Sequence, residues 1–127
     1  MAQERGSAMA TRGILMLVLL CFTIQCEVAQ AKHYTVGGLT GWTFEVESWP
    51  KGKNFMAGDV LVFRYLPTAH NVLKVNHHGY RFCTVPKGSF ITRTGNDHIK
   101  LVKGMNYFIC NLPGHCPNGM RMAIYAK

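Results

Sequence analysis

The chain has 127 residues, of which 48% are hydrophobic and 16% charged, and its formal net charge at pH 7 is +8. A chain of this length is expected to form one domain with one hydrophobic core. The sequence contains no internal repeat and no low-complexity segment, which excludes repeat and fibrous architectures.

The first 31 residues are typical of a secretory signal peptide. Two arginines precede an apolar run over residues 14–22, and the small-residue pattern Ala29-Gln30-Ala31 follows. This order of basic, apolar and A-x-A segments is that of a cleaved leader. The apolar run is shorter than the roughly 20 residues that a membrane anchor needs. We therefore expect a leader over residues 1–31 and one domain over residues 32–127, without a membrane anchor.

The expected mature domain has the pattern of an all-β fold. Short runs of β-branched and aromatic residues alternate with turn residues about every ten positions. The expected strands cover residues 33–36, 60–65, 71–75, 99–102, 107–110 and 122–125. A short segment over residues 45–49, cut off by Pro50, has the only helical signal. The pattern predicts a β-sandwich or barrel with a short helix in a connecting segment.

Three cysteines follow the expected leader: Cys83, Cys110 and Cys116. An odd count in an oxidising compartment indicates one disulfide and one thiol with another role. Three pairings are possible on this count. The pairing of Cys83 with Cys116 is the most economical, because it leaves Cys110 free in a segment that holds other metal-ligand residue types.

The segment from Cys110 to Met120 sets a thiol, an imidazole and a thioether at equal five-residue intervals, with His115 between them. Thiolate and thioether ligands select copper, and imidazole also suits it. Two His, one Cys and a weak axial Met form a blue-copper electron-transfer site. The second imidazole must come from elsewhere, and His70, just before an expected strand, is the best candidate. Met122 competes with Met120, but it lies in the last expected strand and breaks the spacing.

The chain resembles the phytocyanins, and among them the plantacyanin branch of basic blue proteins. The resemblance covers nearly all of residues 32–127 and includes the segment that ends at Met120. The other matching stretches are Tyr34-Thr35-Val36-Gly37, Gly41-Trp42-Thr43-Phe44, Trp49-Pro50-Lys51-Gly52-Lys53, Ala57-Gly58-Asp59-Val60-Leu61, His70-Asn71-Val72 and Tyr107-Phe108-Ile109-Cys110.

This resemblance implies a cupredoxin-like Greek-key sandwich of two sheets with one type 1 copper near one end. The implied ligands are His70, Cys110, His115 and Met120. It also implies the Cys83–Cys116 disulfide. Asn71 is expected to offer a backbone N–H to the Cys110 sulfur, and a partly exposed His115 is expected to be the exit point of the electron.

The expected function is that of a small secreted one-electron carrier, monomeric and located in the extracellular space or cell wall. An enzyme is not expected, because the chain lacks the His-x-His pairs of a trinuclear copper cluster and any P-loop. Cleavage of the leader would leave the net charge at +8, so we expect an acidic redox protein or an anionic wall polysaccharide as partner, and no nucleic acid. The alternative is an extracellular matrix or signalling protein, with a cell-wall or reproductive-tissue role, that acts through its basic surface.

Overall fold

A computed structural model describes residues 11–19 and 30–127 of the chain. The chain divides into two compact units, Met1–Gln30 and Ala31–Lys127. Residues 11–19 form a helix, and no described helix is long and apolar enough to cross a membrane. The remainder of the expected leader up to Ala29 lies outside the described residues, so cleavage after Ala31 stays a prediction.

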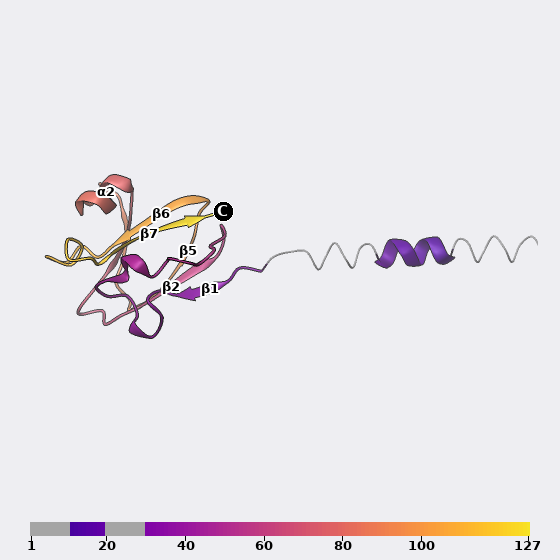
Figure 1. Ribbon diagram of the computed structural model, residues 1–127, viewed down its shortest axis with the longest axis horizontal. Coiled ribbons are helices and arrows are strands. Elements are labelled where there is room, and N and C mark those ends of the chain that lie inside the picture. The colour runs from indigo at the N-terminus through magenta and orange to yellow at the C-terminus, as the bar shows by residue number, and fades with distance from the viewer. Residues whose placement is uncertain (1–10, 20–29) are drawn as a thin grey trace, which may run out of the picture. The chain divides into compact units, whose positions relative to one another are not determined.

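The unit from Ala31 onward is a sandwich of two sheets, shown in Figure 1. One sheet has the order β1-β2-β5, with β1 parallel to β2 and β5 antiparallel to β2. The other has the order β4-β3-β6-β7, with every pair antiparallel. The strands are β1 (His33–Thr35), β2 (Val60–Arg64), β3 (Val72–Val75), β4 (Phe90–Thr92), β5 (Asn96–Lys100), β6 (Gly104–Ile109) and β7 (Arg121–Ala126). This arrangement confirms the predicted Greek-key sandwich.

Three helical segments connect the strands: the 3-10 turns η1 (Gly38–Thr40) and η2 (Val46–Ser48), and the α-helix α2 (His77–Phe82). The turn η2 lies within the segment for which a helix is expected. The sequence pattern did not predict α2, because six residues are too few to show an apolar stripe. Its start is fixed by Asn76, whose side-chain oxygen accepts the Gly79 N–H at 2.8 Å.

Two other differences concern strands. The edge strand β4 was not predicted, since it has three residues and two of them are exposed. The strand expected at residues 99–102 begins three residues earlier, and β6 begins before the expected residue 107. In both cases the polar residues Asn96 and Asn106 lie inside a strand, against their usual propensity, because pairing with the neighbouring strand outweighs it.

The core between the sheets is built around large side chains that are almost fully buried. Trp42 packs edge-on against Phe63, whose ring in turn contacts Phe108. The Trp42 indole N–H donates to the Asn71 carbonyl oxygen at 2.8 Å, so the polar edge of this ring is satisfied. Cys110 and Met120 belong to the same buried cluster. Two of the expected ligand side chains therefore extend from the rigid core itself.

Candidate metal centre

The register of three neighbouring strands brings the expected ligands to one end of the sandwich. Leu73 of β3 lies opposite Ile109 of β6, and Ile109 lies opposite Arg121 of β7. Cys110 follows Ile109 directly, Met120 precedes Arg121 directly, and His70 precedes β3 by two residues. Residues far apart along the chain thus meet where these strands end or begin.

The side chains of His70, Cys110 and His115 converge at this end. Their ligand atoms all lie within 4.8 Å of one another. The His70 Nδ1 lies 3.1 Å from the His115 Nδ1, and the Cys110 Sγ lies 3.4 Å from that same His115 nitrogen. Within residues 11–19 and 30–127, no second cluster of His, Cys, Asp or Glu side chains has such a geometry.

Backbone hydrogen bonds close the loop that carries three of the expected ligands. The Met120 N–H donates to the His115 carbonyl at 3.0 Å, and the Cys110 N–H donates to the Met120 carbonyl at 3.1 Å. Gly119 has a φ of 97°, a left-handed conformation that residues with a Cβ rarely adopt. The three expected ligands are therefore linked to one another through the main chain as well as through any bound ion.

Burial divides the site into a dry half and a half near solvent. Cys110 and Met120 are fully buried, whereas His70 and His115 are half-buried. The half-exposed ring of Phe44 lies against the His115 imidazole, with ring centroids 4.9 Å apart. Burial, followed by the nearby His115, lowers the pKa of His70, which favours the neutral imidazole that can bind a metal.

The donor set fits copper. Cys110 is the free cysteine of the described residues, and a buried thiol beside two imidazoles supplies soft and intermediate donors together. Met120 is buried in the same hydrophobic cluster as Cys110, and its thioether is a poor ligand type for zinc, magnesium or calcium.

Comparison with known proteins identifies the family. A family model described as a plastocyanin-like domain matches residues 42–120. The chain is 50% identical over 123 residues to a chemocyanin from Lilium longiflorum, covering 96% of this chain and 98% of the relative. The structure of cucumber basic protein, a blue copper protein, superposes with a TM-score of 0.74 at 55% identity, covering 75% of this chain and 99% of that one. Spinach plantacyanin superposes with a TM-score of 0.65 at 53% identity, over 68% of this chain and 94% of that one.

The chain belongs to the phytocyanin family. The predicted family and fold are thus confirmed, and a phytocyanin of this kind holds one type 1 copper per chain. The four expected ligand positions lie inside the matched region, and the structure places the ligand atoms of three of them within 4.8 Å of one another.

Asn71 connects the two ligand-bearing segments of this phytocyanin through its side chain. Its Oδ1 accepts the Asn111 backbone N–H at 3.0 Å, and its Nδ2 donates to the Asn111 Oδ1 at 2.6 Å. The expected bond from the Asn71 backbone N–H to the Cys110 sulfur stays a prediction. Sequence reasoning overlooked Asn111, although an Asn directly after each of His70 and Cys110 was a visible signal.

A second polar network, also missed from the sequence, supports His70 from the β2–β5 sheet. The Tyr65 ring lies 6.5 Å from the His70 ring, and its hydroxyl donates to the buried carboxylate of Asp97. Burial and this hydrogen bond raise the pKa of Tyr65 far above its usual value. Residues 65 and 97 are distant in sequence, so no local pattern could have revealed the pair.

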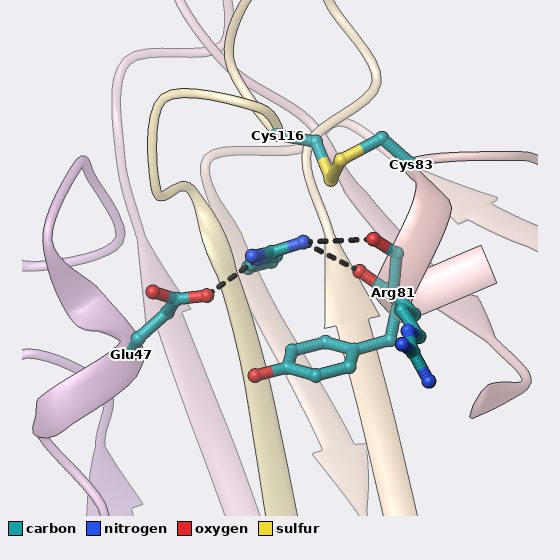
Figure 2. A network of polar contacts seen from close by, with 6 residues as sticks. Glu47, Arg81, Cys83 and Cys116 are labelled. Carbon is teal, nitrogen blue, oxygen red and sulfur yellow. Dashed lines mark hydrogen bonds and ion pairs between the residues drawn. A yellow bond between two sulfur atoms is a disulfide. The ribbon is translucent and has the colours of Figure 1, made fainter. Parts of the chain in front are cut away.

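Arg121, the neighbour of Met120, forms the third network (Figure 2). Its Nη1 donates to the carbonyl oxygens of Tyr80 and Arg81 at 3.1 Å each, and its Nε pairs with Glu47. It thereby connects the last turn of α2 and η2 to the start of β7.

The structure joins Cys83, which follows α2, to Cys116 in the ligand loop, the pairing expected from the family resemblance. The bridge spans 33 residues, and a closed loop of that length stabilises a protein by roughly 3–4 kcal/mol in the chain-entropy model. It attaches the ligand loop to the body of the sandwich.

Proposed function

We propose that this phytocyanin is a one-electron carrier without catalysis of its own. The observation that carries the proposal is the contact of the buried Cys110 sulfur with His115, which itself lies within 3.1 Å of His70. Copper bound at such a site exchanges one electron reversibly between Cu(II) and Cu(I).

The chain contributes a ligand set that resists rearrangement. Cys110 and Met120 extend from the core, and their backbones are hydrogen-bonded to each other. The disulfide and the Asn71–Asn111 pair fix the two segments that carry the imidazoles. A site held between the geometric preferences of the two copper oxidation states keeps the reorganisation barrier for electron transfer low.

His115 is our candidate for the electron's exit point. Its imidazole is half-buried, contacts the Cys110 sulfur on one side and lies against the half-exposed Phe44 ring on the other. A partner that covers Phe44 would come close to His115 without having to open the core.

We propose that the protein works outside the cell, after removal of residues 1–31. The support is the leader pattern, together with a disulfide of the kind that persists in oxidising compartments.

The deciding experiment adds one equivalent of Cu(II) to the wild-type protein, with the Cys83–Cys116 disulfide formed, and to Cys110→Ser. Absorption and EPR spectra of both are then recorded. We expect an intense blue band in the wild type that disappears on reduction, and no such band in Cys110→Ser. Met122→Leu is the matched control, because Met122 is equally buried but lies within β7. A colourless wild type, or a blue Cys110→Ser, would refute the proposal.

The alternative is a matrix or signalling protein that acts through its basic surface. The distribution of charge is the observation that supports this alternative. Of the four acidic residues after Ala31, Asp59 and Asp97 are buried and Glu47 is paired with Arg121. A biological activity that Cys110→Ser retains would assign the role to that surface, and one that Cys110→Ser loses would assign it to the copper site.

A further inference from the structure

Six exposed lysines lie around one end of the sandwich, and we call this group the lysine pole. Its members are Lys32, Lys51, Lys53, Lys100, Lys103 and Lys127. Backbone contacts bring them together from distant parts of the chain. The Val60 N–H donates to the Lys32 carbonyl oxygen at 2.8 Å, and Val60 lies opposite Lys100 in the sheet. The Lys127 N–H donates to the Phe55 carbonyl at 3.0 Å, next to the segment that holds Lys53.

The lysine pole and the copper ligands lie at opposite ends of the sheet β4-β3-β6-β7. In the β6–β7 pair, Gly104 lies opposite Ala126 at one end, and Ile109 lies opposite Arg121 at the other. Lys103 and Lys127 adjoin the first of these pairs, whereas Cys110 and Met120 adjoin the second. Six residues of strand separate the two ends, which corresponds to about 20 Å at 3.3 Å per residue.

Within residues 30–127, no ion pair joins a lysine of the pole to a side-chain carboxylate. The Asp59 carboxylate lies close to Lys32, but it is buried. Its oxygens accept the backbone N–H groups of Lys32 and Met56. Glu47 pairs with Arg121 beside the ligand loop, and the backbone of Glu45 lies next to Gly119 in that loop. A group of like charges of this kind attracts polyanions from solution.

The surface of the pole is also hollowed. An open depression of about 210 Å³ has a lining that includes Lys53, Lys127 and Tyr125. The Lys53 ammonium uses one of its three N–H groups to donate to the Trp49 carbonyl oxygen at 2.7 Å. The Tyr125 side chain is 59% exposed, so the depression combines two lysines with an accessible aromatic ring. This combination suits an acidic sugar, whose carboxylate can bind an ammonium while its apolar ring face covers the tyrosine.

We propose that the lysine pole binds an anionic polysaccharide of the polyuronate type. Lysine is depleted at the cores of protein–protein interfaces, whereas separate, flexible ammonium groups match carboxylates repeated along a polymer. Binding there leaves the copper end, one strand length away, open to a redox partner. The choice of a wall polymer rests on the proposed extracellular location, and the binding itself is independent of copper.

The test measures binding of the copper-loaded protein to unesterified polygalacturonate at several salt concentrations. Lys100→Glu/Lys127→Glu changes two charges at the pole, and the side chains of both residues are exposed. Arg81→Glu/Lys87→Glu is the matched control, with the same change in net charge at exposed positions away from the pole. We expect the pole variant to lose about tenfold or more in affinity and to show a shallower salt dependence, and the control to stay within about threefold of wild type.

Lys53→Gln/Tyr125→Ala tests the depression itself. We expect this variant to bind polygalacturonate more weakly than wild type. The slope of its affinity against salt concentration, divided by the number of lysines left at the pole, should stay unchanged. Equal losses in the pole and control variants would overturn the proposal, since net charge alone would then explain binding. Equal binding of fully methyl-esterified polygalacturonate, or binding to anionic lipid vesicles but not to polygalacturonate, would also overturn it. The blue absorption of the same samples reports on the copper site separately, so failure of the proposed function can be distinguished from failure of this one.

Discussion

The side chain of Asn71 makes two hydrogen bonds to Asn111, and each of these residues directly follows a proposed copper ligand. Asn71 is buried and follows His70, while Asn111 follows Cys110 across the sheet. The pair therefore connects the imidazole contributed by one loop to the thiol contributed by another. Both hydrogen bonds join atoms of the chain itself, so the pair can fix the relative position of the two residues that precede it.

Removal of this connection should lower both stability and the quality of the site. We expect Asn71→Ala to reduce the free energy of unfolding by about 1–3 kcal/mol, because it removes two hydrogen bonds between the buried Asn71 and Asn111, each worth about 0.5–1.5 kcal/mol. Chemical denaturation of the apo protein measures this loss, and Asn54→Ala, at an exposed position, is the control. Equal stability of the two variants would contradict the role given to Asn71.

The axial position should set the reduction potential. A weak thioether at Met120 favours Cu(I) relative to an oxygen donor. We expect Met120→Gln to keep a blue band but to lower the potential by about 59 mV or more, which is a tenfold change in a one-electron equilibrium. Voltammetry measures this difference, and Met122→Leu should leave the potential within a few millivolts of wild type. A shift in Met122→Leu instead would transfer the axial role to Met122.

Asp97 should make the free energy of unfolding depend on pH in the acid range. Burial alone would raise its pKa, but hydrogen bonds from Thr92, Thr94 and Tyr65 outweigh burial and leave the pKa of Asp97 below its usual value. A carboxyl group with a lowered folded-state pKa contributes stability above its unfolded-state pKa of about 3.9 and loses it as the pH falls through the folded-state value.

We therefore expect Asp97→Asn to be about 1–3 kcal/mol less stable than wild type near neutral pH, and the gap to narrow below about pH 4. Denaturation curves recorded from about pH 2.5 to pH 7 provide the comparison. A gap that stayed constant over this range would show that the ionised form of Asp97 is not what stabilises the fold.

The two contacts of Arg121 should differ in their effect. The ion pair with Glu47 lies at the surface, with the two side chains 29% and 40% exposed, so Glu47→Gln should cost no more than about 1 kcal/mol. Arg121→Met should cost about 1–3 kcal/mol, because the carbonyl groups of Tyr80 and Arg81 both lose a charged donor. Thermal unfolding of the two variants measures this order, and a larger loss in Glu47→Gln would reverse the assignment.

Local pattern was enough for much of the fold but not for its polar connections. Strands such as β2 and β7 were predicted because their apolar residues are dense and bounded by turns. The strand β4 and the helix α2 were missed because they are short and largely exposed, and their existence depends on pairing with β3 and on the cap at Asn76.

The donor chemistry of the site could be inferred from the sequence alone. Cys110, His115 and Met120 occupy one short segment, and their donor types alone indicate copper. The folded structure was needed to show that the His70 nitrogen lies 3.1 Å from His115, that Asn111 is hydrogen-bonded to Asn71, and that six separate lysines share one end. Donor identity is a property of each residue. These proximities instead arise from strand register and core packing between segments up to tens of residues apart, which no local spacing encodes.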